Sequence, residues 1–206
     1  LQFNPEFHST TYPAQPVYCS VDTSENLTVI VQTDDAEIDN LNTKLDLNRF
    51  DNYYSTASNL KGLMTTALFG VPEIYQDALS EKRPVLLALP LGSGMPVSVH
   101  SDAPLPMSQL SGYVKKDASE SDGLNIAFIK GEDIAQYTAR ALEREHKVIV
   151  ATGYGSATGK GTLFSNFSLD ADIASTEDLA PTILNALGCN APITFYSTGQ
   201  NLLSPA

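Results

Sequence analysis

Two adjacent carboxylates stand at a place in the sequence where α/β proteins often do chemistry. Asp34 and Asp35 directly follow residues 26–33, an apolar and largely β-branched run. Both alternating faces of that run are apolar, which is typical of a strand covered on both sides in a parallel sheet. Open α/β sheets place their ligands at the carboxyl ends of such strands. The two carboxylates could hold a divalent cation there, or one could cap a helix expected over 36–45.

A second candidate for chemistry is the serine-rich segment 55–59, which contains Ser58 and Asn59. It precedes a helix predicted over 60–68 from the spacing of its apolar residues. A helix amino terminus carries free amides and a positive dipole end, so it can bind an anion or hold a hydroxyl nucleophile. An ordinary capped helix explains the same residues equally simply.

Other polar residues lie at a predicted strand end and in predicted loops. His100 ends an alternating run at 96–100, which predicts a strand, and it forms a possible ligand pair with nearby Asp102. The glycine-rich segment 156–162 is predicted to be a flexible loop. It is not a Walker phosphate loop, because three residues rather than four separate Gly155 from the Gly-Lys pair.

The elements that position these residues can be predicted from the sequence. Strand patterns alternate with helix patterns along the chain. The predicted strands are 26–33, 84–89, 96–100, 124–130 and 147–152, with a shorter one at 49–54. For 84–89 the last turns of a helix are the alternative. Their order predicts an α/β fold, a three-layer α/β/α sandwich with a mostly parallel central sheet. The strands 26–33 and 147–152 are apolar on both faces, so we expect them adjacent, or nearly so, in its centre.

The predicted helices have clearer boundaries than the loops. A helix is expected over 132–145, with an apolar face and a charged face. Another begins near 177–178, where Ser175 and Asp178 have the spacing of a capping box. Pro181 fits only its first turn, and Gly188 is a suitable residue just beyond its end. Residues 115–123 are predicted to be a polar hairpin or linker.

Composition limits the classes of function. The chain has 206 residues, enough for one sizeable domain, which we place at 25–206. Residues 1–24 carry three prolines and four aromatic rings, which predicts an extended arm whose rings tuck into the domain. The net charge of −12 argues against nucleic acid as a partner, because phosphate backbones need clustered Lys and Arg. No apolar run is long enough to span a membrane.

Cys19 and Cys189 are the two cysteines, and their separation fits no zinc motif. They are either buried free thiols or a disulfide pair, depending on the redox state of the compartment. The sequence leaves both states open.

Several segments, taken in order, resemble those of a known superfamily. They are NLTVIVQTDD, YYSTASNLKGLMTTALFG, MPVSVHSDAPLPMSQL, KVIVATGYG, STEDLAPTILNALG and GQNLL. Together they resemble the alkaline phosphatase/sulfatase superfamily, and more narrowly the periplasmic domains of YejM/PbgA-type inner-membrane proteins. The segment between 110 and 124 is much shorter than in typical members.

The resemblance also indicates what the site lacks. Metal-dependent members use an Asp after the first strand, a nucleophile before a helix, and an Asp-His pair after a later strand. Asp34 matches the first position, Asn59 or Leu60 falls at the nucleophile, and Gly153 and Tyr154 stand where the pair would be. A catalytic zinc needs about three or four protein ligands. The resemblance therefore implies no catalytic residue, no metal and no cofactor.

What remains is a vestigial cleft, formed by residues at the family's site positions: Asp34, Asp35, Ser58, Asn59, Gly153 and Tyr154. The implied protein is a catalytically degenerate periplasmic domain, tethered to the inner membrane by a transmembrane segment upstream of Leu1. Its implied role is in lipid A/lipopolysaccharide or cardiolipin homeostasis, through sensing or contact with a membrane lipid or an inner-membrane protein.

Two alternatives remain open. One is an active metal-dependent hydrolase or phosphoethanolamine transferase with rearranged ligands, for example Asp34, Asp35, His100 and Asp102. The other is a periplasmic ligand-binding module that uses the cleft beside Asp34 and Tyr154.

Overall fold

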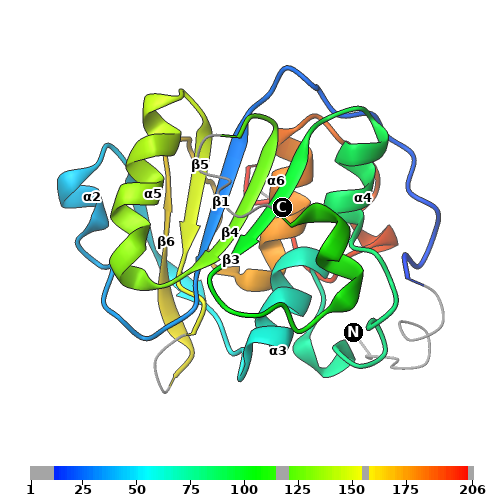
Figure 1. Ribbon diagram of the computed structural model, residues 1–206, viewed down its shortest axis with the longest axis horizontal. Coiled ribbons are helices and arrows are strands. Elements are labelled where there is room, and N and C mark those ends of the chain that lie inside the picture. The colour runs from blue at the N-terminus through cyan, green and yellow to red at the C-terminus, as the bar shows by residue number, and fades with distance from the viewer. Residues whose placement is uncertain (1–11, 115–120, 155–157, 204–206) are drawn as a thin grey trace.

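A computed structural model describes residues 12–114, 121–154 and 158–203. They form one seven-stranded sheet with helices on both faces (Figure 1), a three-layer α/β/α arrangement as predicted. Across the sheet the strands are β3 (Val97–Ser101), β4 (Leu124–Ile129), β1 (Leu27–Gln32), β5 (Lys147–Ala151), β6 (Lys160–Ser165), β2 (Asn48–Tyr54) and β7 (Ala174–Ser175).

The parallel half of the sheet confirms the prediction for its centre. β1 pairs in parallel with β4 on one side and with β5 on the other, so the 26–33 and 147–152 segments are direct neighbours. All six residues of β1 are buried, as are all six of β4. Strands with two apolar faces require cover on both sides, which the two helix layers supply.

The other half contains a strand that we did not predict. Residues Lys160–Ser165 form β6, which runs antiparallel to both β5 and β2, although the sequence predicts a flexible loop over 156–162. Leu163 and Phe164 are fully buried. The glycines that suggested a loop stop at Gly161, so composition averaged over the segment hid the apolar residues that follow. The predicted strand at 49–54 is confirmed as β2.

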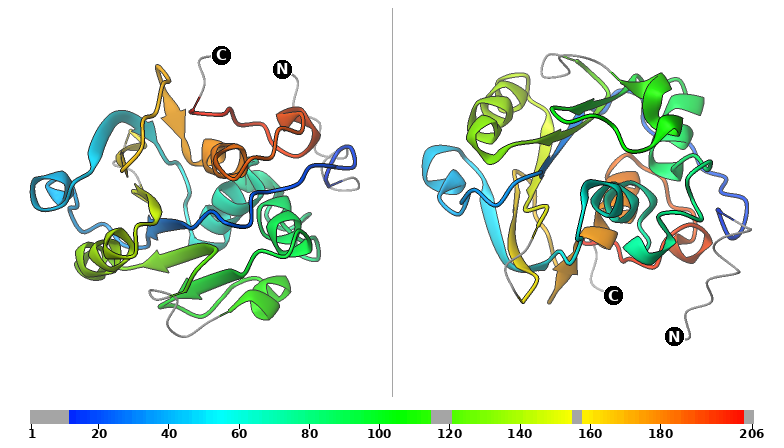
Figure 2. Two further views of the ribbon diagram at one scale, coloured as in Figure 1. Left: turned by 90° about the horizontal axis from the view of Figure 1, so that it is seen from above. Right: turned by 60° about the horizontal axis from the view of Figure 1, so that its bottom comes forward.

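The helices divide between the two faces, as the turned views show (Figure 2). α2 (Leu41–Lys44) and α5 (Gly131–Glu143) cover one face. On the other face lie α3 (Leu60–Met64), α4 (Val85–Gly92) and α6 (Leu179–Ala186). We call these the α5 face and the α6 face.

One strand prediction and one helix prediction need correction. The segment 84–89, predicted as a strand, instead belongs to α4, which packs into the α6-face core through Val85, Leu86 and Leu87. Its run is apolar all round, so periodicity could not separate a buried strand from a buried helix. The helix expected over 36–45 is reduced to the four residues of α2, and 33–40 is irregular.

The remaining helix predictions hold. α3 continues into a π-helical turn, Thr65–Phe69, and ends at Gly70, whose φ of 68° suits glycine. The capping box of Ser175 and Asp178 opens a 3₁₀ turn that leads into α6, so this helix begins where it was predicted. α5 agrees with the predicted 132–145 within two residues at each end.

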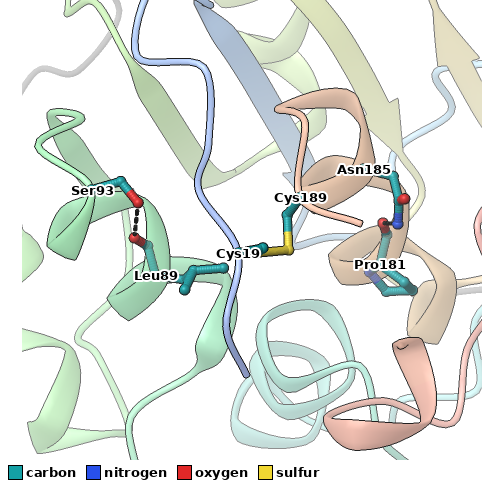
Figure 3. The surroundings of a disulfide bond; sticks show 6 residues. All are labelled: Cys19, Leu89, Ser93, Pro181, Asn185 and Cys189. Atoms are coloured by element: carbon teal, nitrogen blue, oxygen red, sulfur yellow. Dashed lines mark hydrogen bonds between the residues drawn. A yellow bond between two sulfur atoms is a disulfide. The ribbon is translucent and has the colours of Figure 1, made fainter. Parts of the chain in front are cut away.

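Described residues 12–24 of the arm contain no helix or strand and cross the α6 face. The Cys19–Cys189 disulfide fastens the arm beside Leu89 of α4 and the end of α6 (Figure 3). Tyr12 tucks in as expected: it is buried, and its ring meets Phe69 edge-on with centroids 5.0 Å apart. Tyr18 contradicts the same expectation, since it is 86 % exposed. Phe3 and Phe7 lie outside the described residues, as does most of the expected linker 115–123.

Helices capable of crossing a membrane were sought among the described residues, and none is both long and apolar enough.

Candidate functional site

The first candidate ligand, Asp34, makes hydrogen bonds to the protein itself. It follows β1, and its Oδ1 accepts from the amide of Gly131, the first residue of α5, at 3.0 Å. The same oxygen accepts from Nε2 of buried Gln32 at 3.0 Å and from the amide of Ala36 at 3.3 Å. Gln32 also donates to the carbonyl of Ala36, which fixes the loop after β1. Asp34 is therefore a structural cap.

Asp102, on the other side of β4, also accepts a hydrogen bond from a backbone amide at the start of α5. It follows β3, and its Oδ2 accepts from the amide of Lys130 at 2.9 Å. Lys130 is the N-cap residue of α5 and supplies no capping side chain. Two carboxylates from two strands thus satisfy two successive amides at the positive end of α5. Asp34 caps a helix, as one interpretation held, but that helix is α5 rather than the one following β1.

His100 does not join these carboxylates to make a ligand set. Its ring stacks on that of Tyr137 of α5, with centroids 6.2 Å apart and planes 13° from parallel. Within residues 12–114, 121–154 and 158–203, no three His, Cys, Asp or Glu side chains gather in a way that could hold a metal ion. The donor set proposed for a rearranged metal site therefore does not fit a resident ion.

The segment before α3 is also occupied by the protein's own groups. Asn59 is the N-cap of α3, and its Oδ1 accepts from the amide of Gly62 at 2.7 Å. The amide of Ser58 donates to Glu73 Oε2 at 3.0 Å, and its hydroxyl lies 3.2 Å from the same oxygen. Glu73 packs so closely over Gly62 that a Cβ there would overlap its carboxylate. A carboxylate thus lies over the start of α3, close to the hydroxyl that might have reacted.

Gly153 and Tyr154 follow β5 and close the space next to β1. A Cβ on Gly153 would overlap the carbonyl oxygen of Gln32, so only glycine fits this approach. The Ser55 hydroxyl donates to the carbonyl of Gly153. Partial burial, with a further contribution from the negative charge of Glu73, raises the pKa of Tyr154 above its ordinary value. Tyr154 is therefore a neutral phenol at neutral pH.

The structure brings some of the predicted cleft residues together and separates others. Asp35 and Tyr154 line one hollow of about 240 Å³, together with Gln32, Thr152 and Lys160. Ser58 contacts Glu73, whose charge Tyr154 also senses. Asp34 faces α5 instead, and Asn59 is used within α3.

Three residues of this region escaped the sequence reasoning. Gln32 is predicted only as part of the strand 26–33, and no role is predicted for Glu73. Lys160 was placed in a loop. A polar side chain at the end of an otherwise apolar strand, as in the case of Gln32, was the one usable signal.

The sequence was compared with models of known protein families and with curated proteins, and neither comparison found a match.

Proposed function

We propose that this domain is a catalytically inactive relative of the alkaline phosphatase/sulfatase enzymes that works through contacts with other molecules. The observation that carries the proposal is the use of Asp34. The one carboxylate kept at a family ligand position accepts hydrogen bonds from Gly131 and Gln32. A carboxylate engaged in this way is satisfied without an ion.

The start of α3 supports the same proposal. Transfer of a phosphoryl or sulfuryl group needs positive charge or hydrogen-bond donors around an anion. Here the Glu73 carboxylate accepts from the amide and lies within 3.2 Å of the hydroxyl of Ser58. A substrate anion at this place would meet a negative charge and would have to displace Glu73 from two donors.

For the setting, we carry over what the resemblance implies. The domain would lie in the periplasm, attached to a transmembrane segment upstream of Leu1, and would take part in lipid A/lipopolysaccharide or cardiolipin homeostasis. Its net charge of −12 opposes close approach to an anionic lipid surface. An inner-membrane protein partner therefore fits the domain's charge better than direct lipid binding.

The test is elemental analysis of the purified domain, followed by assays with phosphate and sulfate esters after addition of zinc or manganese. We expect no stoichiometric metal and no turnover, in wild type or in Asp34→Ala. The proposal is wrong if metal binds stoichiometrically and turnover appears that Asp34→Ala abolishes. Asp46→Ala, at an exposed carboxylate that belongs to neither candidate site, is the matched control.

A second candidate function, ligand binding without chemistry, rests on the hollow lined by Asp35, Tyr154 and Lys160. A small polar ligand there should perturb the NMR signals of 35–39 and of 154, and the Tyr154→Leu variant should weaken it. If a metabolite screen finds no such ligand, the ligand-binding function is rejected and the contact function is the remaining candidate.

A further inference from the structure

A second hollow lies away from the vestigial cleft. It has a volume of about 530 Å³ and opens between the turn before α4 and the 3₁₀ segment η3 (Ser108–Tyr113). The end of α4 contributes Leu91, which is 48 % exposed. Neither the predicted cleft nor the proposed contact function uses any of these residues.

The two walls of this hollow are held in a fixed relation. Gln109 of η3 donates from Nε2 to the carbonyl of Leu79 at 3.0 Å, which ties η3 to the turn. The turn itself is closed by the amide of Lys82, which donates to the same carbonyl at 3.0 Å. Tyr113, at the other end of η3, is buried. The hollow therefore exists before any ligand binds, which lowers the ordering cost of binding.

Two oppositely charged side chains line the hollow. Glu81 and Arg83 are both exposed, and neither forms an ion pair with any side chain that the structure describes. Ser108 and Ser111 line the same space. A simple anion would be attracted by Arg83 and repelled by Glu81. A simple cation would be attracted by Glu81 and repelled by Arg83. A ligand that carries both charges is attracted by both side chains.

We propose that this hollow binds a small zwitterion of the α-amino-acid class. The guanidinium of Arg83 would take the carboxylate, for which its planar fork is suited. The carboxylate of Glu81 would take the ammonium group. The serine hydroxyls would complete the polar contacts, and Leu91 would cover an aliphatic side chain.

The test is a titration of the whole 206-residue chain with a panel of free L-amino acids, followed by NMR amide shifts. Each ligand is compared with its N-acetyl form, which lacks the ammonium charge, and its carboxamide, which lacks the carboxylate. We expect at least one free amino acid to shift the signals of 80–83 and 108–113. Either modification should weaken it roughly tenfold, the effect of one charge-assisted hydrogen bond.

Matched variants assign the two charges. Arg83→Gln should weaken the free amino acid about tenfold but leave the carboxamide form unchanged. Glu81→Gln should weaken the free amino acid and leave the N-acetyl form unchanged. Lys82→Gln removes a neighbouring charge that does not line the hollow, so it should have little effect. Because these side chains lie on the surface, all three variants should fold.

Three outcomes would overturn the proposal. The first is that no amino acid shifts these signals. The second is binding that survives both Arg83→Gln and Glu81→Gln. The third is that acetate or inorganic phosphate binds as tightly as the amino acid and Glu81→Gln strengthens it, which would make the hollow a plain anion site.

Discussion

The α6 face and the α5 face of the sheet are held in different ways. The α6 face has the larger apolar core, which includes α3, α4, α6 and the arm, and the Cys19–Cys189 disulfide crosses it. The α5 face has a smaller core and is fixed by polar groups at the two ends of α5. Asp34 and Asp102 hold its start, and His146 lies buried just beyond its end. The stability of the α6 face should thus depend mainly on the disulfide. The stability of the α5 face should depend mainly on its charged and polar groups.

The largest expected effect is removal of the disulfide. The Cys19→Ser, Cys189→Ser double variant should lose about 2–5 kcal/mol of unfolding free energy, because the bond closes a very long loop. Denaturant unfolding measures the loss. Hydrogen exchange should rise in the arm and around the end of α6 more than in α5. Equal loss of protection in α5 would show that the two faces are not independently held.

Removal of both caps of α5 comes next. Asp34→Ala and Asp102→Ala should each cost about 0.5–2 kcal/mol, as for other helix caps. Hydrogen exchange at the first turn of α5 should accelerate in both. Asp34→Asn keeps an acceptor oxygen and should cost less. If the exposed Asp35 gives as large a loss on change to Ala, capping is not the cause.

The pH dependence of stability should distinguish the faces. Burial lowers the pKa of His146, whose Nδ1 lies 2.9 Å from Thr28 Oγ1. In the unfolded chain His146 takes up its proton near the ordinary histidine pKa of about 6.5, whereas in the folded protein its imidazole is still neutral at that pH. Stability should therefore fall as pH drops below that value, by at most about 1.4 kcal/mol per pH unit. His146→Gln should flatten the curve below about pH 6.5, as unfolding measured across this range will show.

The smallest effect concerns Glu177, on the α6 face, and it has the opposite sign. Partial burial raises its pKa, with the nearby charge of Asp178 adding to the shift, although Thr198 Oγ1 donates to it at 2.7 Å. The folded protein then takes up this proton at a higher pH than the unfolded chain does. Acidification toward the ordinary Glu pKa should gain stability at this residue. Glu177→Gln should remove that gain, as unfolding measured across the acid range will show.

The sequence predicted most reliably where a local pattern had one structural solution. The strands Leu27–Gln32 and Lys147–Ala151 have two largely apolar faces, and both are central in the sheet. The Ser175–Asp178 spacing predicted the capping box because all its partners lie within four residues. By contrast, the apolar run 84–90 fits a buried strand or a buried helix, and only tertiary packing decides for α4.

The candidate site was harder because its contacts are long-range. Asp34 and Gly131 are 97 residues apart in the chain, and no local pattern pairs them. The same holds for Ser58 with Glu73, whose meeting depends on the path of the chain after α3. Residue types showed which side chains were chemically capable. Only the fold shows that the carboxylates of Asp34 and Glu73 accept hydrogen bonds from backbone amides.

The disulfide also has a consequence for the order of events during synthesis. Its cysteines are 170 residues apart, so the first must wait until almost the whole domain has been made before its partner exists. Until then Cys19 is a thiol on an arm without its anchor, open to mixed disulfides with other molecules. The disulfide can therefore form only after nearly all of the domain has been synthesised. In a chain interrupted before residue 189, the arm would have no covalent link to the rest of the domain.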